Sequence, residues 1–357
     1  MSKTTVTIPP KNARILLVRL SSIGDVLHTT AIAHQIKQYL PDCHLTWLVS
    51  PPAATLLENN PDIDRLLVWD RRPIDKAGAS LHLGTCYAEL KKAAELLHQY
   101  EFDIALDVQG LFLTGILTRM SRAKRRIGIH ERHEGNSLFM SEMAPEIDDP
   151  HKIRRYLTAL RPLGYDPKKF RPGLVLKLKD GWQDYARKFW QKHGVDPSRP
   201  ILFVNTRTTW PDKNWKPEYF GEALRELPPL VQIVFCGAPA DIPFVKTAQQ
   251  NLFRPSVSIA GETNLRELAA LFKTGTLLLT GDTGPLYIAE AVGLSTLSLW
   301  GPTHPTIYGP LSAGHRFIIT PNECRACCHT HCKKKTNACM DAIPPSVVAE
   351  RLREIFY

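Results

Sequence analysis

The turn after one short apolar run contains residues suited to binding an anion. Residues 276–279 predict a buried strand, and the turn 281–285, Gly-Asp-Thr-Gly-Pro, follows shortly after it. Pro285 is typical of the first turn of a helix. A helix N terminus presents free N–H groups and a partial positive charge, Thr283 adds a hydroxyl, and Gly284 lets the backbone approach closely. The turn is a candidate diphosphate site, and the alternative is an ordinary capped strand–helix turn.

A second turn of this kind contains a carboxylate. The apolar run 15–20 leads into Ser21-Ser-Ile-Gly-Asp25, where a helix is predicted to begin. The fingerprint Gly-x-Gly-x-x-Gly of dinucleotide-binding domains is absent, which argues against a nicotinamide-dependent dehydrogenase. Asp25 would either cap the helix or act as a general base. Because a helix N terminus lowers the pKa of a carboxyl group, Asp25 would stay ionised and would be a weak base.

Two loops in the second half of the chain carry further polar groups. After the predicted strand 201–205, Thr208, Thr209 and Lys213 supply two hydroxyls and an ammonium that could meet a phosphate. The alternative is a solvent-exposed loop, which fits poorly with the two tryptophans there, because tryptophan usually packs against other groups. At the end of the next predicted strand, Asp241 would either bind ribose hydroxyls or cap its own helix.

These turns lie between elements that alternate between strand and helix. Short apolar runs predict strands covered on both faces, and the helices between them predict parallel sheets. The predicted strands are 14–20, 44–49, 65–69, 102–108, 126–129, 201–205, 232–236, 256–260, 276–280 and 296–300. The predicted helices are 25–39, 87–99, 182–193, 217–226, 241–250, 264–273 and 285–292. The fold class is therefore α/β, with two doubly wound Rossmann-like domains facing each other across a cleft, and ligands bind beyond the carboxyl ends of such strands.

Length and composition agree with two domains of a soluble protein. The chain has 357 residues, more than one core usually holds, and residues 162–179, rich in proline, glycine and lysine, are the expected linker between domains 1–170 and 171–343. A net charge of +10 favours anionic partners, but no basic surface interleaved with aromatic residues is visible, so we expect no nucleic acid. No apolar run reaches the ~18 residues that span a bilayer, and no signal-peptide core is present, which favours a cytoplasmic location.

The motifs, taken in order, resemble glycosyltransferase family 9, the bacterial lipopolysaccharide heptosyltransferases. The resemblance covers the chain from its first predicted strand to the C terminus. Its motifs are Val18-Arg-Leu-Ser-Ser-Ile-Gly-Asp-Val-Leu-His28, Thr208-Thr209 with Lys213, Gly237-Ala-Pro239, Gly281-Asp-Thr-Gly284 and Gly301-Pro-Thr-His-Pro305. It implies a GT-B fold, an ADP-heptose donor, an inner-core lipopolysaccharide acceptor and inversion at the anomeric carbon. It also implies that catalysis needs no cofactor and no metal ion.

The resemblance also implies roles for single residues. Asp25 maps to the catalytic base, and we expect Ser22 and Gly24 of the same turn on the acceptor side. The implied donor-binding residues are Thr208, Thr209 and Lys213 at the phosphates, Asp241 at the ribose, and Asp282, Thr283 and Gly284 at the diphosphate and sugar. The chain departs from the family where Tyr287 replaces the usual histidine and where residues 293–296 lack the usual proline. The Tyr287 hydroxyl can still form a hydrogen bond to the donor.

Two alternatives share the same fold. One is a nucleotide-sugar epimerase, which needs no second substrate, and the other is a non-catalytic protein that binds sugar nucleotides. A heptosyltransferase would work in the cytoplasm, with peripheral contact at the cytoplasmic face of the inner membrane. As in GT-B proteins, the last segment, 344–357, is predicted as an amphipathic helix that crosses back to the first domain. A helix lying on the membrane is the alternative.

A cysteine cluster and a basic run leave their roles open. The spacing of Cys324, Cys327, Cys332 and Cys339 predicts a possible structural metal site, and an incidental role is the alternative. The run 119–126 carries five cations in eight positions, among them Arg122, Lys124 and Arg125. These cations would either dock anionic groups of the acceptor or form a solvated helix end.

Overall fold

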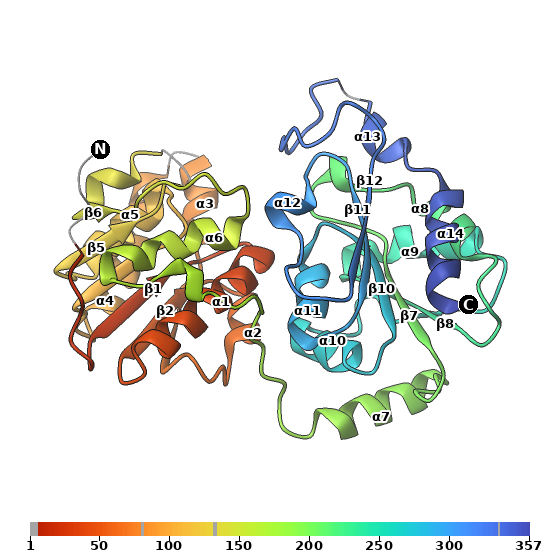
Figure 1. Cartoon of the computed structure of the whole chain (residues 1–357), viewed down its shortest axis with the longest axis horizontal. Helices are drawn as coiled ribbons and strands as arrows, with labels where there is room; N and C mark the ends of the chain where they lie inside the picture. The colour runs from red at the N-terminus through yellow and green to blue at the C-terminus, as the bar shows by residue number, and fades with distance from the viewer. Residues whose placement is uncertain (1–5, 80–81, 131–133, 335) are drawn as a thin grey trace. The chain divides into compact units, whose positions relative to one another are not determined.

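The chain divides into two compact units, each built around its own sheet. The computed structural model describes residues 6–79, 82–130, 134–334 and 336–357. The first unit is Met1–Lys177 and the second is Leu178–Tyr357. Figure 1 shows the strands and helices of each unit in chain order.

The first unit contains a six-stranded sheet whose neighbouring strands all run parallel, in the order β3-β2-β1-β4-β5-β6. Its strands are β1 (Arg14–Val18), β2 (His44–Val49), β3 (Arg65–Val68), β4 (Ile104–Asp107), β5 (Arg125–Gly128) and β6 (Glu142–Met143). Four of the five residues of β1 are buried, as expected for the apolar central strand of a parallel sheet.

Helices join these strands and supply the rest of the first core. They are α1 (Ile23–Tyr39), α2 (Ala54–Leu57), α3 (Arg72–Ala79), α4 (Leu83–Leu97), α5 (Phe112–Met120) and α6 (Lys152–Leu157), with 3₁₀ turns η1 (Asn136–Phe139), η2 (Thr158–Leu163) and η3 (Pro167–Lys169). α4 contacts α3 and α5, and α1 contacts α6. Leu16 and Val18 of β1 pack with Leu97 of α4 in one buried cluster.

The second unit repeats this plan with its own strands. All neighbouring strands are parallel, in the order β12-β11-β10-β7-β8-β9. The strands are β7 (Ile201–Asn205), β8 (Gln232–Cys236), β9 (Val257–Ser258), β10 (Leu277–Gly281), β11 (Thr296–Trp300) and β12 (His315–Ile319). The helices are α7 (Trp182–His193), α8 (Pro217–Leu224), α9 (Ile242–Gln250), α10 (Leu265–Phe272), α11 (Gly284–Val292), α12 (Pro305–Tyr308), α13 (Ala338–Asp341) and α14 (Pro345–Phe356), with 3₁₀ turns η4 (Pro211–Lys213) and η5 (Pro239–Asp241).

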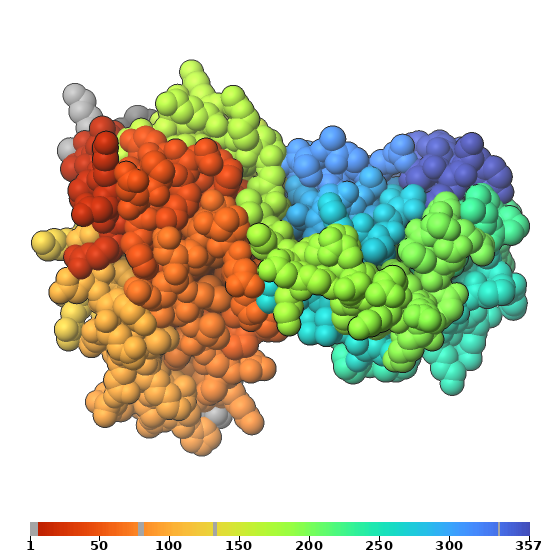
Figure 2. All heavy atoms as spheres, turned by 90° about the horizontal axis from the view of Figure 1, so that it is seen from below, coloured from red at the N-terminus to blue at the C-terminus, as the bar shows by residue number. Residues whose placement is uncertain are grey.

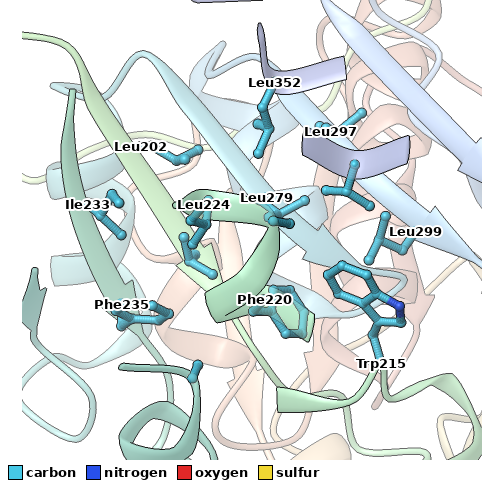
Figure 3. Close-up of a cluster of buried hydrophobic side chains, with 14 of the residues drawn as sticks. Leu202, Trp215, Phe220, Leu224, Ile233, Phe235, Leu279, Leu297, Leu299 and Leu352 are labelled. Carbon is cyan, nitrogen blue, oxygen red and sulfur yellow. The ribbon is translucent and has the colours of Figure 1, made fainter. Parts of the chain in front are cut away.

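The hydrophobic core of the second unit contains side chains from its sheet and from helices α8 and α14. Figure 3 shows Phe220 and Leu224 of α8 among leucines of β7, β10 and β11. Trp215 lies in the same cluster, and its indole N–H donates to the backbone oxygen of Ile343 at 2.9 Å. By contrast α7 lies on the surface of this unit, where its spheres are visible in Figure 2, and only Ala186 and Trp190 of its twelve residues are buried.

The last helix packs differently from the sequence-based expectation. That expectation had residues 344–357 cross back to the first domain. In the structure α14 contacts α8, and its Val348 and Leu352 are buried in the core of the second unit. The amphipathic pattern was interpreted correctly, but an apolar face does not indicate which core it will join.

The α/β class and the doubly wound plan of both sheets are confirmed. All ten predicted strands are present, with ends that differ by a few residues. Two edge strands were not predicted. β6 has only two residues, and β12 begins with the polar pair His315-Arg316 and has two of its five residues exposed. These two edge strands lack the long apolar run that is typical of the buried strands.

Candidate functional site

The two sheets share one topological feature that locates ligand sites. Connections leave β1 and β4 in opposite directions across the first sheet, and β7 and β10 do the same in the second. In doubly wound sheets ligands bind outside the carboxyl ends of the strands at this switch point. The predicted turns after β1, β7 and β10 lie at these places.

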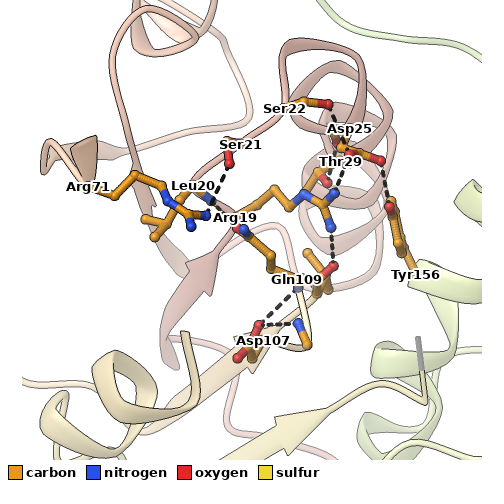
Figure 4. Close-up of polar contacts among 12 residues, drawn as sticks. Arg19, Leu20, Ser21, Ser22, Asp25, Thr29, Arg71, Asp107, Gln109 and Tyr156 are labelled. Atoms are coloured by element: carbon orange, nitrogen blue, oxygen red, sulfur yellow. Dashed lines mark hydrogen bonds and ion pairs between the residues drawn. The ribbon is translucent and has the colours of Figure 1, made fainter. Parts of the chain in front are cut away.

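In the first unit, Asp25 is the centre of a polar cluster (Figure 4). One of its carboxylate oxygens lies 2.7 Å from Nη2 of Arg19 and accepts a hydrogen bond of 3.0 Å from the Ser22 hydroxyl. The other oxygen accepts 2.8 Å from the hydroxyl of Tyr156, which comes from α6. The N-cap of α1 is Ser22, and Asp25 lies within the first turn. Helix capping is therefore not the role of Asp25.

The surrounding charges decide the ionisation of Asp25. Burial by itself would raise the pKa of its carboxyl group. The positive charges of Arg19, Lys152 and His28, together with the hydrogen bond from Tyr156, outweigh burial and hold that pKa well below its usual range. Asp25 is thus ionised at neutral pH. Its side chain is 23% exposed, whereas that of Arg19 is 5% exposed, so the carboxylate is open to a ligand and its partner is not.

Backbone contacts at the ends of β1 and β4 hold this cluster in place. Nη1 of Arg19 donates to the backbone oxygen of Val108 at 2.7 Å, and the Leu20 N–H donates to Oε1 of Gln109 at 2.7 Å. Asp107 accepts from the N–H groups of Gln109 and Gly110 at 2.9 and 3.0 Å. Burial raises the pKa of Asp107, although these hydrogen bonds act against it. Asp107 therefore shapes the loop that anchors Arg19.

In the second unit, Asp282 is the centre of a similar cluster. One carboxylate oxygen lies 2.6 Å from Nζ of Lys213 and accepts 2.7 Å from the hydroxyl of Thr303. The other accepts 2.6 Å from the hydroxyl of Tyr287. Asp282 and Lys213 have side chains that are 6% and 12% exposed. The residue that departs from the family pattern, Tyr287, is thus a direct partner of the turn's aspartate.

The Asp282 cluster lies at the amino end of α11. Thr283 is the N-cap of this helix and Gly284 its first residue, and the Thr283 side chain makes no capping hydrogen bond. Its hydroxyl is therefore not used by the helix. Gly293 closes the other end of α11 in the left-handed conformation, with φ of 77°. The predicted strand, turn and helix N terminus are all present, and they form the geometry that favours an anion.

The loop after β7 brings Lys213 to this cluster. The ammonium lies 4.0 Å from the ring centroid of Trp210, a cation–π contact. Thr208 is buried and supports the loop, because its N–H donates to Oδ1 of Asn214 at 2.7 Å and its hydroxyl donates to the backbone oxygen of Trp210 at 2.8 Å. Thr209 is exposed. The structure therefore places Thr208 as a support of the loop, and Thr209 remains open to a ligand.

Asp241 forms a neighbouring pair with an arginine. Its Oδ1 lies 3.1 Å from Nη1 of Arg207, and its Oδ2 accepts 2.8 Å from the N–H of Ala238. The guanidinium of Arg207 lies 4.8 Å from the ring centroid of Phe244. Asp241 has a local structural role in the η5 turn, and both it and Arg207 lie beyond the carboxyl ends of β7 and β8.

The structure does not bring the basic run to Asp25. Arg125 is the first residue of β5, so the run lies at the amino edge of the parallel sheet, and Asp25 follows the carboxyl end of β1. Arg125 is also paired with Glu142 at 2.9 Å and donates to the backbone oxygens of Thr7 and Pro162. A cation that does lie near the Asp25 turn is Arg71, whose Nη1 is 3.4 Å from the Ser21 hydroxyl.

Sequence reasoning missed several partners of the residues in the predicted turns. These partners are Arg19, Tyr156, Arg71, Thr303 and Arg207. Arg19 and Thr303 lie inside the quoted motifs, so their position was a usable signal. Tyr156 lies on α6, which has six residues and no clear apolar period, and no local pattern connects it to Asp25.

All eight cysteines are free, and among the described residues no three His, Cys, Asp or Glu side chains are placed to hold a metal ion. Cys339 is buried, Cys324 and Cys332 are partly exposed, and Cys327 is exposed. Within the described part of the chain, no helix is long and apolar enough to cross a membrane.

Comparison with known proteins identifies the class. The model of glycosyltransferase family 9 (heptosyltransferase) matches residues 90–338. The match covers more than half of the chain and includes the Lys213 loop, the Asp282 turn and α11. The chain belongs to glycosyltransferase family 9 and is a glycosyltransferase with the GT-B fold, as the sequence predicted. This assignment favours glycosyl transfer over the epimerase and the non-catalytic binding protein.

Individual relatives agree with the assignment. The lipopolysaccharide core heptosyltransferase OpsX of Haemophilus influenzae is 28% identical over 309 residues, which cover 85% of this chain and 83% of that protein. The crystal structure of the glycosyl transferase family 9 from Veillonella parvula has a TM-score of 0.80 at 23% identity and covers 96% of this chain and 97% of its own. E. coli heptosyltransferase WaaC with ADP-2-deoxy-2-fluoro heptose has a TM-score of 0.70 at 22% identity and covers 96% and 99%.

Proposed function

We propose that this protein transfers a heptose from ADP-heptose to an inner-core lipopolysaccharide acceptor, with inversion at the anomeric carbon. The observation that carries the proposal is the Lys213–Asp282 pair beside the amino end of α11, at the switch point of the second sheet. The relatives support the choice of ligands, because one is a lipopolysaccharide core heptosyltransferase and another was solved with an ADP-heptose analogue.

The donor diphosphate gains negative charge as the bond from the anomeric carbon to oxygen breaks. In our proposal this charge develops at the amino end of α11, where Thr283 and Gly284 begin the helix. Lys213 contributes its positive charge there, held in position by Asp282 and Trp210. Thr209 is exposed on the same loop and can add a hydrogen bond, and Asp241 with Arg207 would contact the nucleoside.

Asp25 is proposed to accept the proton of the attacking acceptor hydroxyl. Its low pKa makes it a weak base, so the proton must move late, after the sugar has gained positive charge and the attacking hydroxyl has become acidic. Its partial exposure permits this contact, since a ligand hydroxyl can replace the hydrogen bond from Ser22. Gly24 is buried in the first turn of α1, directly before Asp25.

The acceptor is proposed to bind at the carboxyl edge of the first sheet. Arg71 lies beside Ser21 there and is 20% exposed. Its Nε and Nη2 are bonded to Asp75 at 2.8 Å, so Nη1 is the nitrogen that can contact a carboxylate or phosphate of the acceptor. Arg122, Lys124 and Arg125 were predicted for this role from the sequence. Because these three cations lie at the amino edge of the sheet, away from Asp25, they form a second proposed acceptor site. An experiment below distinguishes the two proposed acceptor sites.

We further propose that the protein works at the cytoplasmic face of the inner membrane, in peripheral contact with it. Two exposed apolar side chains support this location: Phe112, 47% exposed, and Leu138, 81% exposed. Both side chains lie against Gly135, so they are neighbours. α5 begins just beyond the carboxyl end of β4, on the side of the sheet where the acceptor would bind. Co-sedimentation with anionic vesicles should weaken in Phe112→Ser and Leu138→Ser.

The direct test supplies purified protein with ADP-heptose and a defined inner-core acceptor. The expected products are free ADP and an acceptor extended by one heptose, with the anomeric configuration inverted by NMR. Change of the donor in the absence of acceptor would instead indicate an epimerase, and tight donor binding without any turnover would indicate a binding protein. We expect full rates without added magnesium or manganese.

A further inference from the structure

An arginine and a phenylalanine pack together just beyond the carboxyl ends of β7 and β8. The guanidinium carbon of Arg207 lies 4.8 Å from the ring centroid of Phe244, which covers one face of the planar group. Among the described residues no second ring lies over Arg207, and its side chain is 35% exposed. A planar ligand group can therefore stack on the other face of the guanidinium.

Asp241 holds the Arg207 guanidinium in this position. Its Oδ1 lies 3.1 Å from Nη1 of Arg207, and its Oδ2 accepts 2.8 Å from the N–H of Ala238. Nη1 also donates to the backbone oxygen of Ala240 at 3.3 Å. Each oxygen of Asp241 is thus already bonded, and its side chain is 15% exposed, less than half the value for Arg207. The sequence suggested that Asp241 contacts the ribose, whereas in the structure Arg207 is the more accessible of the two groups.

The backbone of Arg207 is anchored to the strand that leads to Asp282. Nδ2 of Asn205, at the end of β7, donates to the backbone oxygen of Arg207 at 2.9 Å and to the hydroxyl of Thr280 at 3.2 Å. Thr280 lies in β10, two residues before Asp282. The guanidinium is therefore held at a fixed place relative to the turn that is proposed to bind the diphosphate.

The strand order places Arg207 where the base of a bound nucleotide would lie. β7 lies between β10 and β8 in the sheet. Neighbouring strands are ~4.8 Å apart, so the carboxyl ends of β10 and β8 are separated by roughly 10 Å. A nucleotide with its diphosphate at the amino end of α11 would extend over about this distance to its base, and the Arg207–Asp241 pair bridges the ends of β7 and β8.

We propose that Arg207 binds the base of the donor nucleotide by stacking, and that it favours a purine over a pyrimidine. The inference rests on the proposed donor site and adds the group that recognises its base. A guanidinium stacks on flat aromatic rings, and the two fused rings of a purine offer it more area than the single ring of a pyrimidine. Asp241 and Phe244 are positioning residues, because they fix the plane of the guanidinium and need not touch the ligand.

The test compares the affinities of ADP, UDP and inorganic pyrophosphate for the purified wild type and its variants, measured by calorimetry. Arg207→Ala should weaken ADP binding about tenfold and leave pyrophosphate binding unchanged. The preference of the wild type for ADP over UDP should shrink in the same variant. Arg207→Lys should behave as Arg207→Ala does, since an ammonium keeps the charge but has no planar face. Lys213→Ala should instead weaken the binding of both ADP and pyrophosphate.

The second unit contains a matched control for this substitution. The guanidinium carbon of Arg225 lies 4.7 Å from the ring centroid of Phe253, which is nearly the same geometry. Arg225 follows α8 and Phe253 follows α9, so this pair lies at the amino edge of the sheet. Arg225→Ala should therefore bind each of these ligands as the wild type does. Circular dichroism checks that every variant is folded.

A double substitution tests the positioning role of Asp241. Asp241→Asn alone should weaken ADP binding, because the amide no longer holds the guanidinium by charge. The same change should cause no further loss in the Arg207→Ala background, since the group that it positions is already absent. A further loss in that background would show a direct contact of Asp241 with the nucleotide and would overturn its positioning role.

Several results would overturn the stacking role of Arg207. They are unchanged ADP affinity in Arg207→Ala, equal losses of ADP and pyrophosphate affinity in that variant, and wild-type ADP affinity in Arg207→Lys. An unchanged ratio of ADP to UDP affinity in Arg207→Ala would overturn the preference for purines. If any of these results accompanies heptose transfer by the wild type, this inference fails and the proposed function stands. If the expected losses are found in a protein that transfers no heptose, the proposed function fails and this inference stands.

Discussion

Asp25 in the first unit and Asp282 in the second have nearly the same set of partners. Each carboxylate has one oxygen bonded to a tyrosine hydroxyl, and its other oxygen bonded to a cation and to a second hydroxyl. For Asp25 the partners are Tyr156, Arg19 and Ser22, and for Asp282 they are Tyr287, Lys213 and Thr303. Both clusters lie at the carboxyl ends of parallel strands, beside the first turn of a helix.

The two clusters differ in which member can reach a ligand. Asp25 is 23% exposed and its cation Arg19 is fixed by the backbone of Val108. Asp282 is 6% exposed, and its cation Lys213 is carried by a loop beside Trp210. In the first cluster the cation is anchored and the carboxylate is available. In the second both members are largely enclosed, and the cation, 12% exposed, is the more accessible of the two. We therefore propose that the same kinds of partner support a base in one unit and a phosphate-binding ammonium in the other.

The largest effect is expected from Asp25→Asn. Loss of a positioned base should lower kcat by roughly 10²–10⁴-fold. The measurement is the steady-state rate of heptose transfer at saturating donor and acceptor. Ser22→Ala, which removes only one hydrogen bond to the same carboxylate, is the control and should retain most of the activity. Near-normal turnover in folded Asp25→Asn would reduce Asp25 to an ordinary residue of the first helical turn.

The next largest effect is expected from Lys213→Ala. Removal of a charge-assisted contact to phosphate should weaken binding of ADP and of the intact donor by about 1.5–3 kcal/mol. Calorimetry measures both affinities. Lys216→Ala is the matched control, because Lys216 lies three residues away and pairs with Asp341 at 3.2 Å. If Lys213→Ala binds both ligands as tightly as the wild type, Lys213 lies outside the donor site.

A smaller effect is expected from Tyr156→Phe and Tyr287→Phe, and the two variants should change different kinetic parameters. In Tyr156→Phe the pKa of Asp25 should rise toward its usual range, because the hydrogen bond from Tyr156 helps to lower it. In a plot of rate against pH, the loss of activity at low pH should then occur at a higher pH than in the wild type, because Asp25 becomes protonated at a higher pH. Tyr287→Phe should leave this loss of activity at the wild-type pH and raise the donor KM. Identical shifts of this pH in both variants would contradict the assignment of Asp25 as the base.

The smallest effect is expected from the basic run. If the acceptor binds at the carboxyl edge, neutralising Arg122 and Lys124 together should leave the acceptor KM and its salt dependence unchanged. Arg71→Gln should raise that KM, because Arg71 lies beside Ser21. A rise of acceptor KM in the Arg122 and Lys124 variant, with none in Arg71→Gln, would restore the proposal made from the sequence. The comparison is made at two salt concentrations, because exposed charges are screened within ~8 Å at physiological salt.

The sequence predicted the central strands and the turns that follow them, because both rest on local patterns. Apolar runs identified β1, β7 and β10, and the turns after them supplied Asp25, Lys213 and Asp282. Partners from distant segments were not predictable, since Tyr156 is 131 residues from Asp25. The place of the basic run was predictable but was overlooked, because residues that begin a parallel strand lie at the amino edge, away from ligands. The destination of α14 depended on tertiary packing that no local pattern encodes.

The most direct test of the central comparison is the donor dissociation constant of Asp25→Asn and Asp282→Asn, measured side by side by calorimetry. Asp25 is proposed to act on the acceptor, so Asp25→Asn should bind ADP-heptose as the wild type does. Asp282 holds Lys213 in position, so Asp282→Asn should weaken donor binding by roughly tenfold or more, equivalent to ~1.4 kcal/mol. Equal losses in the two variants, or a loss confined to Asp25→Asn, would contradict the division of roles between the two aspartates.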